Sequence, residues 1–304
     1  MTTGLVSGVK NLETHDGPGI RTTLFLQGCS LRCAWCHNPE SISREPLLLY
    51  TDLRCESCGR CAAACPCGAQ AMDATGKHVL DRGKCRRCGR CVEACLPDAL
   101  RFSAREVNVD DALALLLEDF DFYEQSGGGV TLSGGEPLCQ AAFCEELLRR
   151  LRAEGVHAAV DTCGNVPWDA FERVLPHAQL FLYDIKLMDA GRHRVLTGCG
   201  NELILENLRR LAGRGAAIEV RIPVIPTLTL SPAECRAAGE FLAGLPRAVT
   251  VRLLAYHDYA RDSYRHAGMA DSMPRAPRPS AGDLEDAAVI LRSRGLRVIN
   301  SLSE

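Results

Sequence analysis

The stretch TTLFLQGCSLRCAWCHN, residues 22–38, combines an apolar run with three closely spaced cysteines. Its first six residues predict a β-strand, and the loop after the strand carries Cys29, Cys33 and Cys36. Three thiolates spaced C-x3-C-x2-C on one loop can bind three irons of a 4Fe–4S cubane and leave the fourth iron open. A structural zinc site that uses His37 or a distant cysteine is the alternative on spacing alone.

After about residue 103, apolar runs alternate with helix-like stretches. Strands are predicted at Thr22–Gln27, Gly129–Ser133, Val156–Val160, Leu180–Asp184, Ile218–Ile222, Val249–Leu254 and Leu296–Ile299. Helices are predicted at Asp110–Glu124, Gln140–Glu154, Glu202–Leu211, Pro232–Ala243 and Ala281–Arg294. Because strands joined by helices form right-handed βαβ units, we predict an α/β fold with a parallel sheet of about seven strands. Functional residues are expected at the carboxyl ends of these strands.

A cysteine repeat separates the first strand from the others. The pattern C-x2-C-x2-C-x3-C occurs twice within about Leu53–Phe102, a stretch with few large apolar residues. This spacing matches the bacterial ferredoxin run, in which the fourth cysteine of each run ligates the cluster of the other run. The predicted ligand sets are Cys55, Cys58, Cys61 and Cys95 for one cluster, and Cys85, Cys88, Cys91 and Cys65 for the other. We expect an inserted small domain that folds around its clusters.

Composition narrows the class of protein further. The 304 residues are 46% hydrophobic and 24% charged, which is typical of a globular chain. Lys and Arg total 35 against 38 Asp and Glu, so the basic surface expected for nucleic-acid binding is not predicted. No apolar run is long enough to span a membrane, and residues 1–10 do not resemble a signal peptide. We therefore expect a cytoplasmic protein that uses its 17 cysteines for metal or redox chemistry rather than for disulfides.

Polar residues follow several predicted strands. The segment Ser133–Pro137 has two glycines that permit close backbone approach, and a glutamate that suits a cationic ligand amine. Asp161 ends one strand, and Asp184 and Lys186 follow another. Two carboxylates and a lysine can form a buried ion pair, or Lys186 can hold a ligand carboxylate, and the residues alone leave both possibilities open.

With these motifs in order along the chain, the sequence resembles the radical S-adenosylmethionine (SAM) superfamily. The pattern C-x3-C-x-aromatic-C of that superfamily is matched by the cysteine loop with Trp35. More narrowly, the segments Thr14–Thr22, Gly127–Pro137 and Tyr183–Lys186 resemble those of glycyl-radical enzyme activating enzymes. The chain departs from that family at Ala255, where proline is usual, and at Ser263, where the family has lysine.

The resemblance implies roles for individual residues. The open iron would bind the amino and carboxylate groups of SAM, Lys186 would contact the carboxylate, and the glycine-rich segment would bind the amino group. Asp161, Thr162 and Asp184 would hold a monovalent cation, and Asp16 would meet the partner's glycine-containing peptide. Cys29, Cys33, Cys36 and Lys186 are the candidate catalytic residues. The candidate SAM contacts are Trp35, His37, Asn38, Gly134, Gly135, Glu136, Asp161, Asp184, Lys186, Arg221 and His257.

The resemblance also implies a fold and a reaction. Residues 1–52 and 103–304 would form a partial (β/α)6 barrel of the radical SAM type, and residues 53–102 a ferredoxin-like insert with two 4Fe–4S clusters. One electron from flavodoxin or ferredoxin would cleave SAM to a 5'-deoxyadenosyl radical, which takes hydrogen from a backbone glycine of a partner glycyl-radical enzyme. Two alternatives are a radical SAM enzyme that acts on a small molecule or peptide, and a non-enzymatic electron-transfer protein.

Overall fold

A nine-stranded sheet forms the larger part of the computed structural model, which describes residues 2–300. Seven of its strands are parallel and lie side by side in chain order. They are β2 (Arg21–Leu26), β8 (Gly129–Gly134), β9 (Ala158–Thr162), β10 (Leu180–Asp184), β11 (Ile218–Val224), β12 (Thr250–Ala255) and β13 (Arg297–Asn300). The predicted parallel sheet is confirmed, with strand limits that differ by one or two residues.

Two antiparallel strands extend the sheet beyond β2. The strand β1 (Thr3–Glu13) pairs with β2, and β7 (Arg105–Asn108) pairs with β1. The sequence analysis did not predict either strand, because β1 buries only two of its eleven residues and lacks the regular apolar alternation that marks a half-buried strand. The sheet is therefore mixed.

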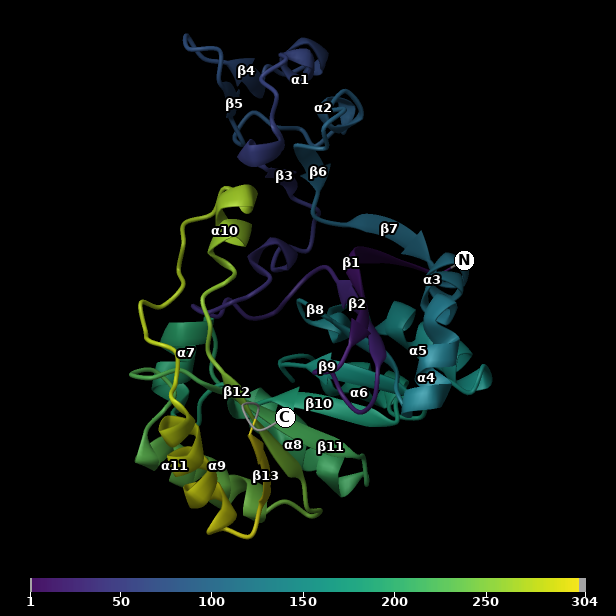
Figure 1. The fold of residues 1–304 in the computed structure, drawn as a ribbon. Helices are drawn as coiled ribbons and strands as arrows, with labels where there is room; N and C mark the ends of the chain where they lie inside the picture. The colour runs from purple at the N-terminus through teal and green to yellow at the C-terminus, as the bar shows by residue number, and fades with distance from the viewer. Residues whose placement is uncertain (1, 301–304) are drawn as a thin grey trace.

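Helices pack on the sheet and bury one apolar stripe each. In α5 (Ala141–Ala153) the buried positions Phe143, Cys144, Leu147, Leu148 and Leu151 recur every three or four residues, which is the spacing of a single helix face. The other packed helices are α6 (Trp168–Val174), α8 (Glu202–Gly213), α9 (Pro232–Ala243) and α11 (Ala281–Arg292). A Ser280–Asp283 capping box begins α11. Together with the strands these helices enclose the main core (Figure 1).

The predicted helix Asp110–Glu124 is wrong in one respect, since it is two helices. These are α3 (Val109–Leu116) and α4 (Phe120–Ser126), separated by a 3-10 turn at Leu117–Asp119. At this turn the Asp119 carboxylate accepts hydrogen bonds from Thr22 and Asn11, which ties the break to the sheet. Short helices that the sequence did not predict include α7 (Ala190–Thr197), whose last turn contacts the cysteine loop, and α10 (Arg261–Ala267), which lies beside the cysteine-rich stretch (Figure 1).

The cysteine-rich stretch projects from the sheet domain (Figure 1). Its base is the antiparallel pair β3 (Leu48–Tyr50) and β6 (Leu100–Phe102). Farther out lie the hairpin β4 (Gln70–Met72) and β5 (His78–Leu80) and two short helices, α1 (Arg60–Ala64) and α2 (Arg90–Glu93). Further 3-10 turns occur at Pro39–Ser41, Asp52–Arg54 and Pro137–Gln140. A small apolar cluster of its own, which includes Leu48 and Leu100, supports this part of the chain.

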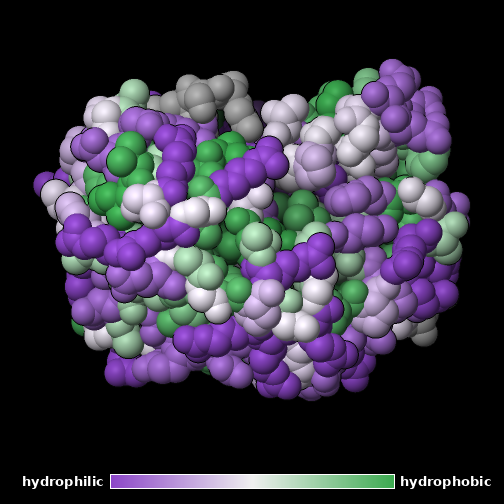
Figure 2. Space-filling view, turned by 90° about the horizontal axis from the view of Figure 1, so that it is seen from below, coloured by the Kyte–Doolittle hydropathy of each residue, from purple (hydrophilic) through white to green (hydrophobic). Residues whose placement is uncertain are grey.

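The face turned away from the insert carries mostly hydrophilic side chains, with smaller apolar groups between them (Figure 2). Among residues 2–300, every helix is too short or too polar to cross a membrane. A second apolar cluster lies between the cysteine loop and the chain segments that follow β11 and β12. In it, Trp35 packs with residues such as Ile225, Tyr256 and Tyr264. This cluster holds the cysteine loop against the strand ends.

Candidate active site

A cavity of about 240 Å³ opens at the carboxyl edge of the parallel strands. One wall is the cysteine loop that follows β2, and the other is formed by residues at the ends of β8 to β12. The predicted site residues that line it are Cys29, Cys33, Trp35, Cys36, His37, Asn38, Gly134, Gly135, Asp161, Asp184, Lys186 and Arg221. The predicted residues Asp16, Glu136, Thr162 and His257 are not part of its lining.

Backbone hydrogen bonds hold the cysteine loop in place. The amide of Arg32 donates to Thr197 O at 2.7 Å, and the amide of Ala34 donates to Leu196 O at 2.8 Å. Both acceptors belong to α7, the helix that follows β10 in the chain. The Trp35 side chain is buried in the second apolar cluster, so the aromatic position of the motif acts as an anchor.

The three cysteines of the loop are partly buried at the wall of the cavity. Burial raises the pKa of Cys33 to about 12 and that of Cys36 to about 11. A hydrogen bond with the Cys163 thiol lowers the pKa of Cys29. Buried thiols with raised pKa values ionise when a metal stabilises the thiolate. Three soft sulfur donors on one loop therefore fit iron of an iron–sulfur cluster.

Two glycines bring the end of β8 into contact with the start of the cysteine loop. A Cβ atom on Gly134, whose φ is +117°, would lie 2.3 Å from the backbone N and O of Leu26. A Cβ atom on Gly135 would lie 2.4 Å from Gly28 O. The glycine pair is therefore required for backbone packing between β8 and the loop, in addition to any approach of a ligand.

The Glu136 carboxylate faces the protein interior. It is fully buried and accepts hydrogen bonds from Thr162 Oγ1 at 2.9 Å, from the Cys163 amide at 2.8 Å and from the Leu138 amide at 3.1 Å. Burial raises its pKa. In this arrangement Glu136 and Thr162 join the ends of β8 and β9 beneath the cavity, and neither side chain lines it.

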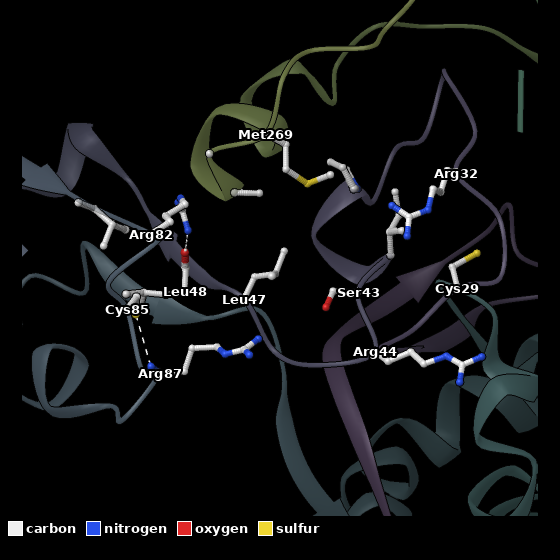
Figure 3. Close-up of a pocket in the computed structure, with 15 residues that line it drawn as sticks. Cys29, Arg32, Ser43, Arg44, Leu47, Leu48, Arg82, Cys85, Arg87 and Met269 are labelled. Carbon is white, nitrogen blue, oxygen red and sulfur yellow. Dashed lines mark hydrogen bonds between the residues drawn. The ribbon is translucent and has the colours of Figure 1, made fainter. Parts of the chain in front are cut away.

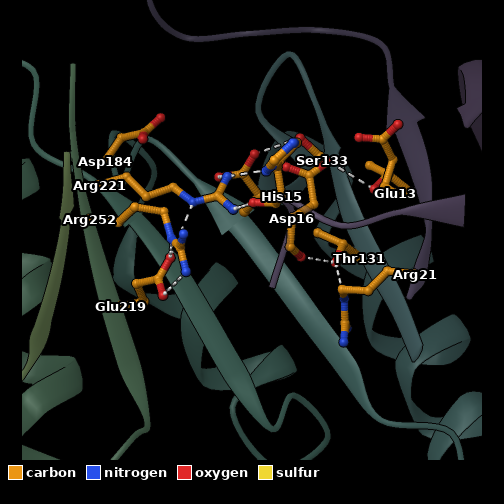
Figure 4. A network of polar contacts seen from close by, with 12 residues as sticks. Glu13, His15, Asp16, Arg21, Thr131, Ser133, Asp184, Glu219, Arg221 and Arg252 are labelled. Carbon is orange, nitrogen blue, oxygen red and sulfur yellow. Dashed lines mark hydrogen bonds and ion pairs between the residues drawn. The ribbon is translucent and has the colours of Figure 1, made fainter. Parts of the chain in front are cut away.

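Charged side chains gather on the strand-end wall of the cavity (Figure 4). Lys186 Nζ donates to Asp184 Oδ2 at 2.6 Å, and although burial opposes ionisation, this carboxylate raises the pKa of Lys186. Ser133 Oγ donates to Asp161 Oδ2 at 2.7 Å, and Arg221 Nη1 lies 3.6 Å from Asp161 Oδ1. Burial raises the pKa of Asp161 to about 7, against the effect of Arg221. The Lys186–Asp184 pair and the Arg221–Asp161 pair each place a cationic and an acidic side chain on the cavity wall, where a ligand that carries both charges could bind.

Two smaller pockets lie in the insert, and each combines cysteines from both repeats. The outer pocket is lined by Cys55, Cys58, Cys61 and Cys95, among other residues. The inner pocket is lined by Cys65, Cys85, Cys88 and Cys91, and also by Cys67. Within residues 2–300, no three Cys, His, Asp or Glu side chains are close enough to share one metal ion. Each pocket nevertheless groups the four cysteines that the crossed ferredoxin pattern predicts, and in a cubane each of them would bind a different iron, so the two ligand sets stay a prediction.

The two repeats also share an unusual backbone. Ser57 and Arg87, at the same position of each repeat, have φ values of 53° and 54°. Gly59 and Gly89 have φ values of 74° and 83°, and each precedes a short helix. Equal strain at equivalent positions indicates that each repeat adopts the same cysteine-presenting turn.

Comparison with known proteins extends these observations. Residues 15–185 match the family model described as a 4Fe–4S single cluster domain. The chain is 42% identical over 285 residues to trans-4-hydroxy-L-proline dehydratase activating enzyme of Clostridioides difficile, covering 93% of this chain and 94% of the relative. It is 39% identical over 303 residues to benzylsuccinate synthase activating enzyme of Thauera aromatica, covering 97% and 91%. The chain belongs to the glycyl-radical enzyme activating enzymes.

A solved structure supports the same family. A domain of pyruvate-formate lyase-activating enzyme from Bacteroides vulgatus is 33% identical, with a TM-score of 0.50, and covers 57% of this chain and 99% of that domain. A radical SAM methyltransferase from Sphaerobacter thermophilus, 15% identical with a TM-score of 0.55, covers 99% of this chain and 77% of that protein, and shows likeness of fold alone. This activating enzyme therefore has a radical SAM fold.

Membership of the family establishes the reaction. A glycyl-radical enzyme activating enzyme cleaves SAM reductively and abstracts hydrogen from a glycine of its partner enzyme. Of the three readings of the sequence, activation is therefore confirmed over the small-molecule enzyme and the electron carrier. The activating enzyme acts on a protein substrate.

The loop His15–Gly19 of the activating enzyme lies beside the cavity and is held by two buried arginines (Figure 4). Arg221 Nη2 donates to His15 O at 2.8 Å, and Arg21 Nη1 donates to Pro18 O at 3.1 Å. The Asp16 carboxylate accepts from Thr23 Oγ1 at 2.9 Å and lies 3.4 Å from Arg221 Nη1. The contact of Asp16 with a partner peptide stays a prediction, and the structure places its carboxylate between Thr23 of β2 and Arg221, which lines the cavity.

Two histidines stack at the rim of the cavity in this activating enzyme. The rings of His37 and His257 are 4.2 Å apart, and His37 Nε2 lies 3.1 Å from His257 O. His37 lines the cavity, and His257 supports it from behind. Cys163, which the sequence analysis did not assign to the site, is buried and forms part of the cavity wall. Its position directly after the Asp161–Thr162 strand end was the signal that could have identified it.

Proposed function

We propose that this activating enzyme binds three 4Fe–4S clusters. Cys29, Cys33 and Cys36 would hold the SAM-binding cluster at the active-site cavity. Cys55, Cys58, Cys61 and Cys95 would hold one auxiliary cluster, and Cys65, Cys85, Cys88 and Cys91 the other. The observation that carries this proposal is that each insert pocket is lined by three cysteines of one repeat and the fourth cysteine of the other.

The cavity residues suit SAM. A cluster bound by the loop would supply an open iron and the electron that SAM cleavage consumes. Lys186, with its raised pKa, is a cation at neutral pH and would hold the SAM carboxylate. Because the Glu136 carboxylate is already occupied by three protein donors, the strand-end backbone around Gly134 and Gly135 is the better candidate for the SAM amino group. Glu136 is then a positioning residue.

The monovalent-cation proposal rests on the oxygens of Asp161, Thr162 and Asp184. In the structure Asp161 is bonded to Ser133, Thr162 to Glu136, and Asp184 to Lys186. Oxygen donors suit a hard cation, but binding one there would require the Thr162 hydroxyl to turn away from Glu136. A SAM titration in potassium and in tetramethylammonium buffers tests the proposal, because a bound cation makes SAM affinity depend on potassium.

The insert supports the proposed domain division. Residues 53–102 carry the cysteines of both auxiliary sites, with β3 just before them completing the base of the insert, while the described residues on either side carry the sheet and the cavity. The ends at Met1 and at 301–304 lie outside the described residues. The repeated turns and crossed pockets favour a ferredoxin-like insert, and the singly wound parallel strands favour a partial barrel.

The partner and the donor follow from the chemistry of the site. A glycyl-radical enzyme supplies the glycine, and reduced flavodoxin or ferredoxin is the proposed source of the electron, in the cytoplasm where thiols stay reduced. Two relatives are named as the activating enzymes of trans-4-hydroxy-L-proline dehydratase and of benzylsuccinate synthase. The candidate partner is therefore a glycyl-radical enzyme of the kind that these relatives activate.

Iron analysis and spectroscopy test the proposal together. Protein reconstituted under anaerobic conditions should contain about twelve irons and as many sulfides per chain, as three cubanes require. Electron paramagnetic resonance (EPR) of the reduced protein should show one cluster signal that shifts when SAM is added. About four irons, or zinc in place of iron, would refute the auxiliary clusters, and a spectrum insensitive to SAM would refute the open iron.

A further inference from the structure

The two insert pockets lie at different distances from the sheet domain. The chain joins the insert to the sheet domain at residues 47 and 103, where the Ser103 amide donates to Leu47 O at 2.8 Å. In the β3–β6 pair, Leu48 and Phe102 are partners next to this junction and line the inner pocket. Tyr50 and Leu100, partners at the far end of the same pair, line the outer pocket. The inner pocket therefore lies closer to the sheet domain.

A cavity of about 740 Å³ lies between the inner pocket and the cysteine loop (Figure 3). Cys85 of the inner pocket lines one side and Cys29 of the loop lines the other, with Ser43 and Leu47 between them in the view. Among the described residues that line this cavity there is none of the outer pocket's cysteines. Cys29 also lines the active-site cavity, so the loop separates the two spaces.

Hydrogen bonds continue from the inner pocket to the loop through α10. The Cys85 amide donates to Arg82 O at 3.3 Å, and the Arg82 guanidinium donates to Leu48 O and, at 3.0 Å, to His266 O. From the same helix, Tyr264 Oη donates to Cys36 O at 3.2 Å. The outer pocket's side of the insert meets α10 through the Arg265–Asp52 ion pair, at 3.9 Å between half-exposed side chains.

A buried side-chain pair connects the two insert pockets. Gln70 Nε2 donates to Cys91 Sγ of the inner pocket at 3.3 Å, and Gln70 Oε1 lies 2.6 Å from His78 Nε2. His78 lines the outer pocket, and both side chains are at most 4% exposed. The pockets thus form a series: outer pocket, Gln70–His78 pair, inner pocket, cysteine loop.

We infer that a cluster held in the outer pocket would receive each electron first, and that a cluster held in the inner pocket would pass it to the cluster held by the cysteine loop. This inference rests on the proposed function, since it requires clusters in both pockets. A one-electron reductant of the flavodoxin or ferredoxin class is oxidised by one electron, and the cluster at the loop is finally reduced by one electron. No bond forms or breaks in these transfers. Because electron transfer slows steeply with distance, the inner pocket is the nearer donor, since it lies on the sheet-domain side of the insert and Cys85 faces the same cavity as Cys29.

A matched pair of variants tests the order. Cys58 and Cys88 occupy the same position in the two repeats, and both are exposed. The Cys58→Ser and Cys88→Ser variants are compared by EPR in the reduced state with SAM present. Magnetic coupling that broadens the SAM-shifted signal should be lost in Cys88→Ser and kept in Cys58→Ser. Loss in Cys58→Ser alone, or equal coupling in the two variants, would overturn the order.

Reduction kinetics test the direction of flow. With reduced flavodoxin as donor, Cys88→Ser should keep the parental rate for reduction of the outer cluster, and the loop cluster should be reduced at least about tenfold more slowly. A parental rate at the loop cluster in Cys88→Ser would show that the inner pocket is bypassed.

A second pair keeps all ligands, in case a cysteine variant loses the whole insert. Gln70→Leu removes the hydrogen bond to Cys91, and Arg60→Leu removes the one from Arg60 Nε to Cys58 Sγ, which spans 3.2 Å. Hydrogen bonds to cluster sulfurs raise the reduction potential. In a redox titration, the potential at which coupling appears should fall in Gln70→Leu and stay unchanged in Arg60→Leu. The opposite pattern would overturn the order.

Iron content separates the two proposals. About four irons in the parent protein refutes the proposed auxiliary clusters themselves. About twelve irons with the wrong coupling pattern refutes only the order of transfer.

Discussion

Replacing Gly134 by alanine tests whether the end of β8 is set by backbone packing against β2. The added Cβ would lie 2.3 Å from both N and O of Leu26, and the φ of +117° disfavours a side chain. The matched control is Gly155→Ala, where φ is +76° and no atom lies within 4 Å of the added Cβ. The control should lose about 1–2 kcal/mol from the left-handed backbone alone. Gly134→Ala should lose roughly 1–3 kcal/mol more, because overpacking adds its own cost.

The assay is thermal unfolding of the anaerobically reconstituted protein, with SAM binding measured on the same samples. For a chain of this size each 1 kcal/mol lowers Tm by about 2–4 °C. Gly134→Ala should therefore melt roughly 2–12 °C below Gly155→Ala, and only Gly134→Ala should bind SAM more weakly. Equal melting temperatures and equal SAM affinity in the two variants would refute the claim that backbone contact positions this strand end.

Four further outcomes follow from the same geometry. Cys33→Ala should abolish SAM cleavage and lower the iron content by about four per chain; retained cleavage at full iron content contradicts the assignment. Lys186→Met should weaken SAM binding at least about tenfold by calorimetry, with Lys186→Arg restoring part of it. Burial raises the folded-state pKa of Asp161 to about 7, whereas an Asp in the unfolded chain releases its proton near pH 4. Between these two pH values the folded protein keeps the proton and the unfolded chain does not, so the free energy of unfolding falls as pH rises. From pH 5 to pH 8 the Tm of the parent should therefore fall relative to the Tm of Asp161→Asn. Parallel Tm curves for the two proteins would contradict the raised pKa of Asp161. Gly268→Ala would place a Cβ 2.1 Å from Arg82 Nε, so amide hydrogen exchange should rise around residues 48 and 266 while the sheet stays protected; unchanged exchange there would contradict the packing.

Sequence patterns predicted the parallel strands well because each is a short, mainly apolar run bounded by turns. The strand Leu180–Asp184 and the helix Pro232–Ala243 agree with the structure residue for residue. The antiparallel strand β1 escaped prediction because its stability comes from pairing with β2 and β7 rather than from its own apolar pattern. Pairing between strands that are far apart in the chain leaves little trace in a single sequence.

The site shows the same division. Local spacing was enough to group Cys29, Cys33 and Cys36, because three ligands on one short loop must lie close together. It was not enough for Glu136, because a residue's place in a motif does not say which way its side chain points. The neighbouring strand end, through Thr162 and the Cys163 amide, draws that carboxylate inward.

By itself, the amino-acid sequence determined the cysteine motifs and the order of strands and helices, since these depend on residues close together in the chain. Only the tertiary structure decided which cysteine pocket lies next to the active site. That depends on the register of β3 with β6 and on the packing of α10 between the insert and the cysteine loop. Such relations join residues as far apart as Cys36 and Tyr264, and no local spacing encodes them.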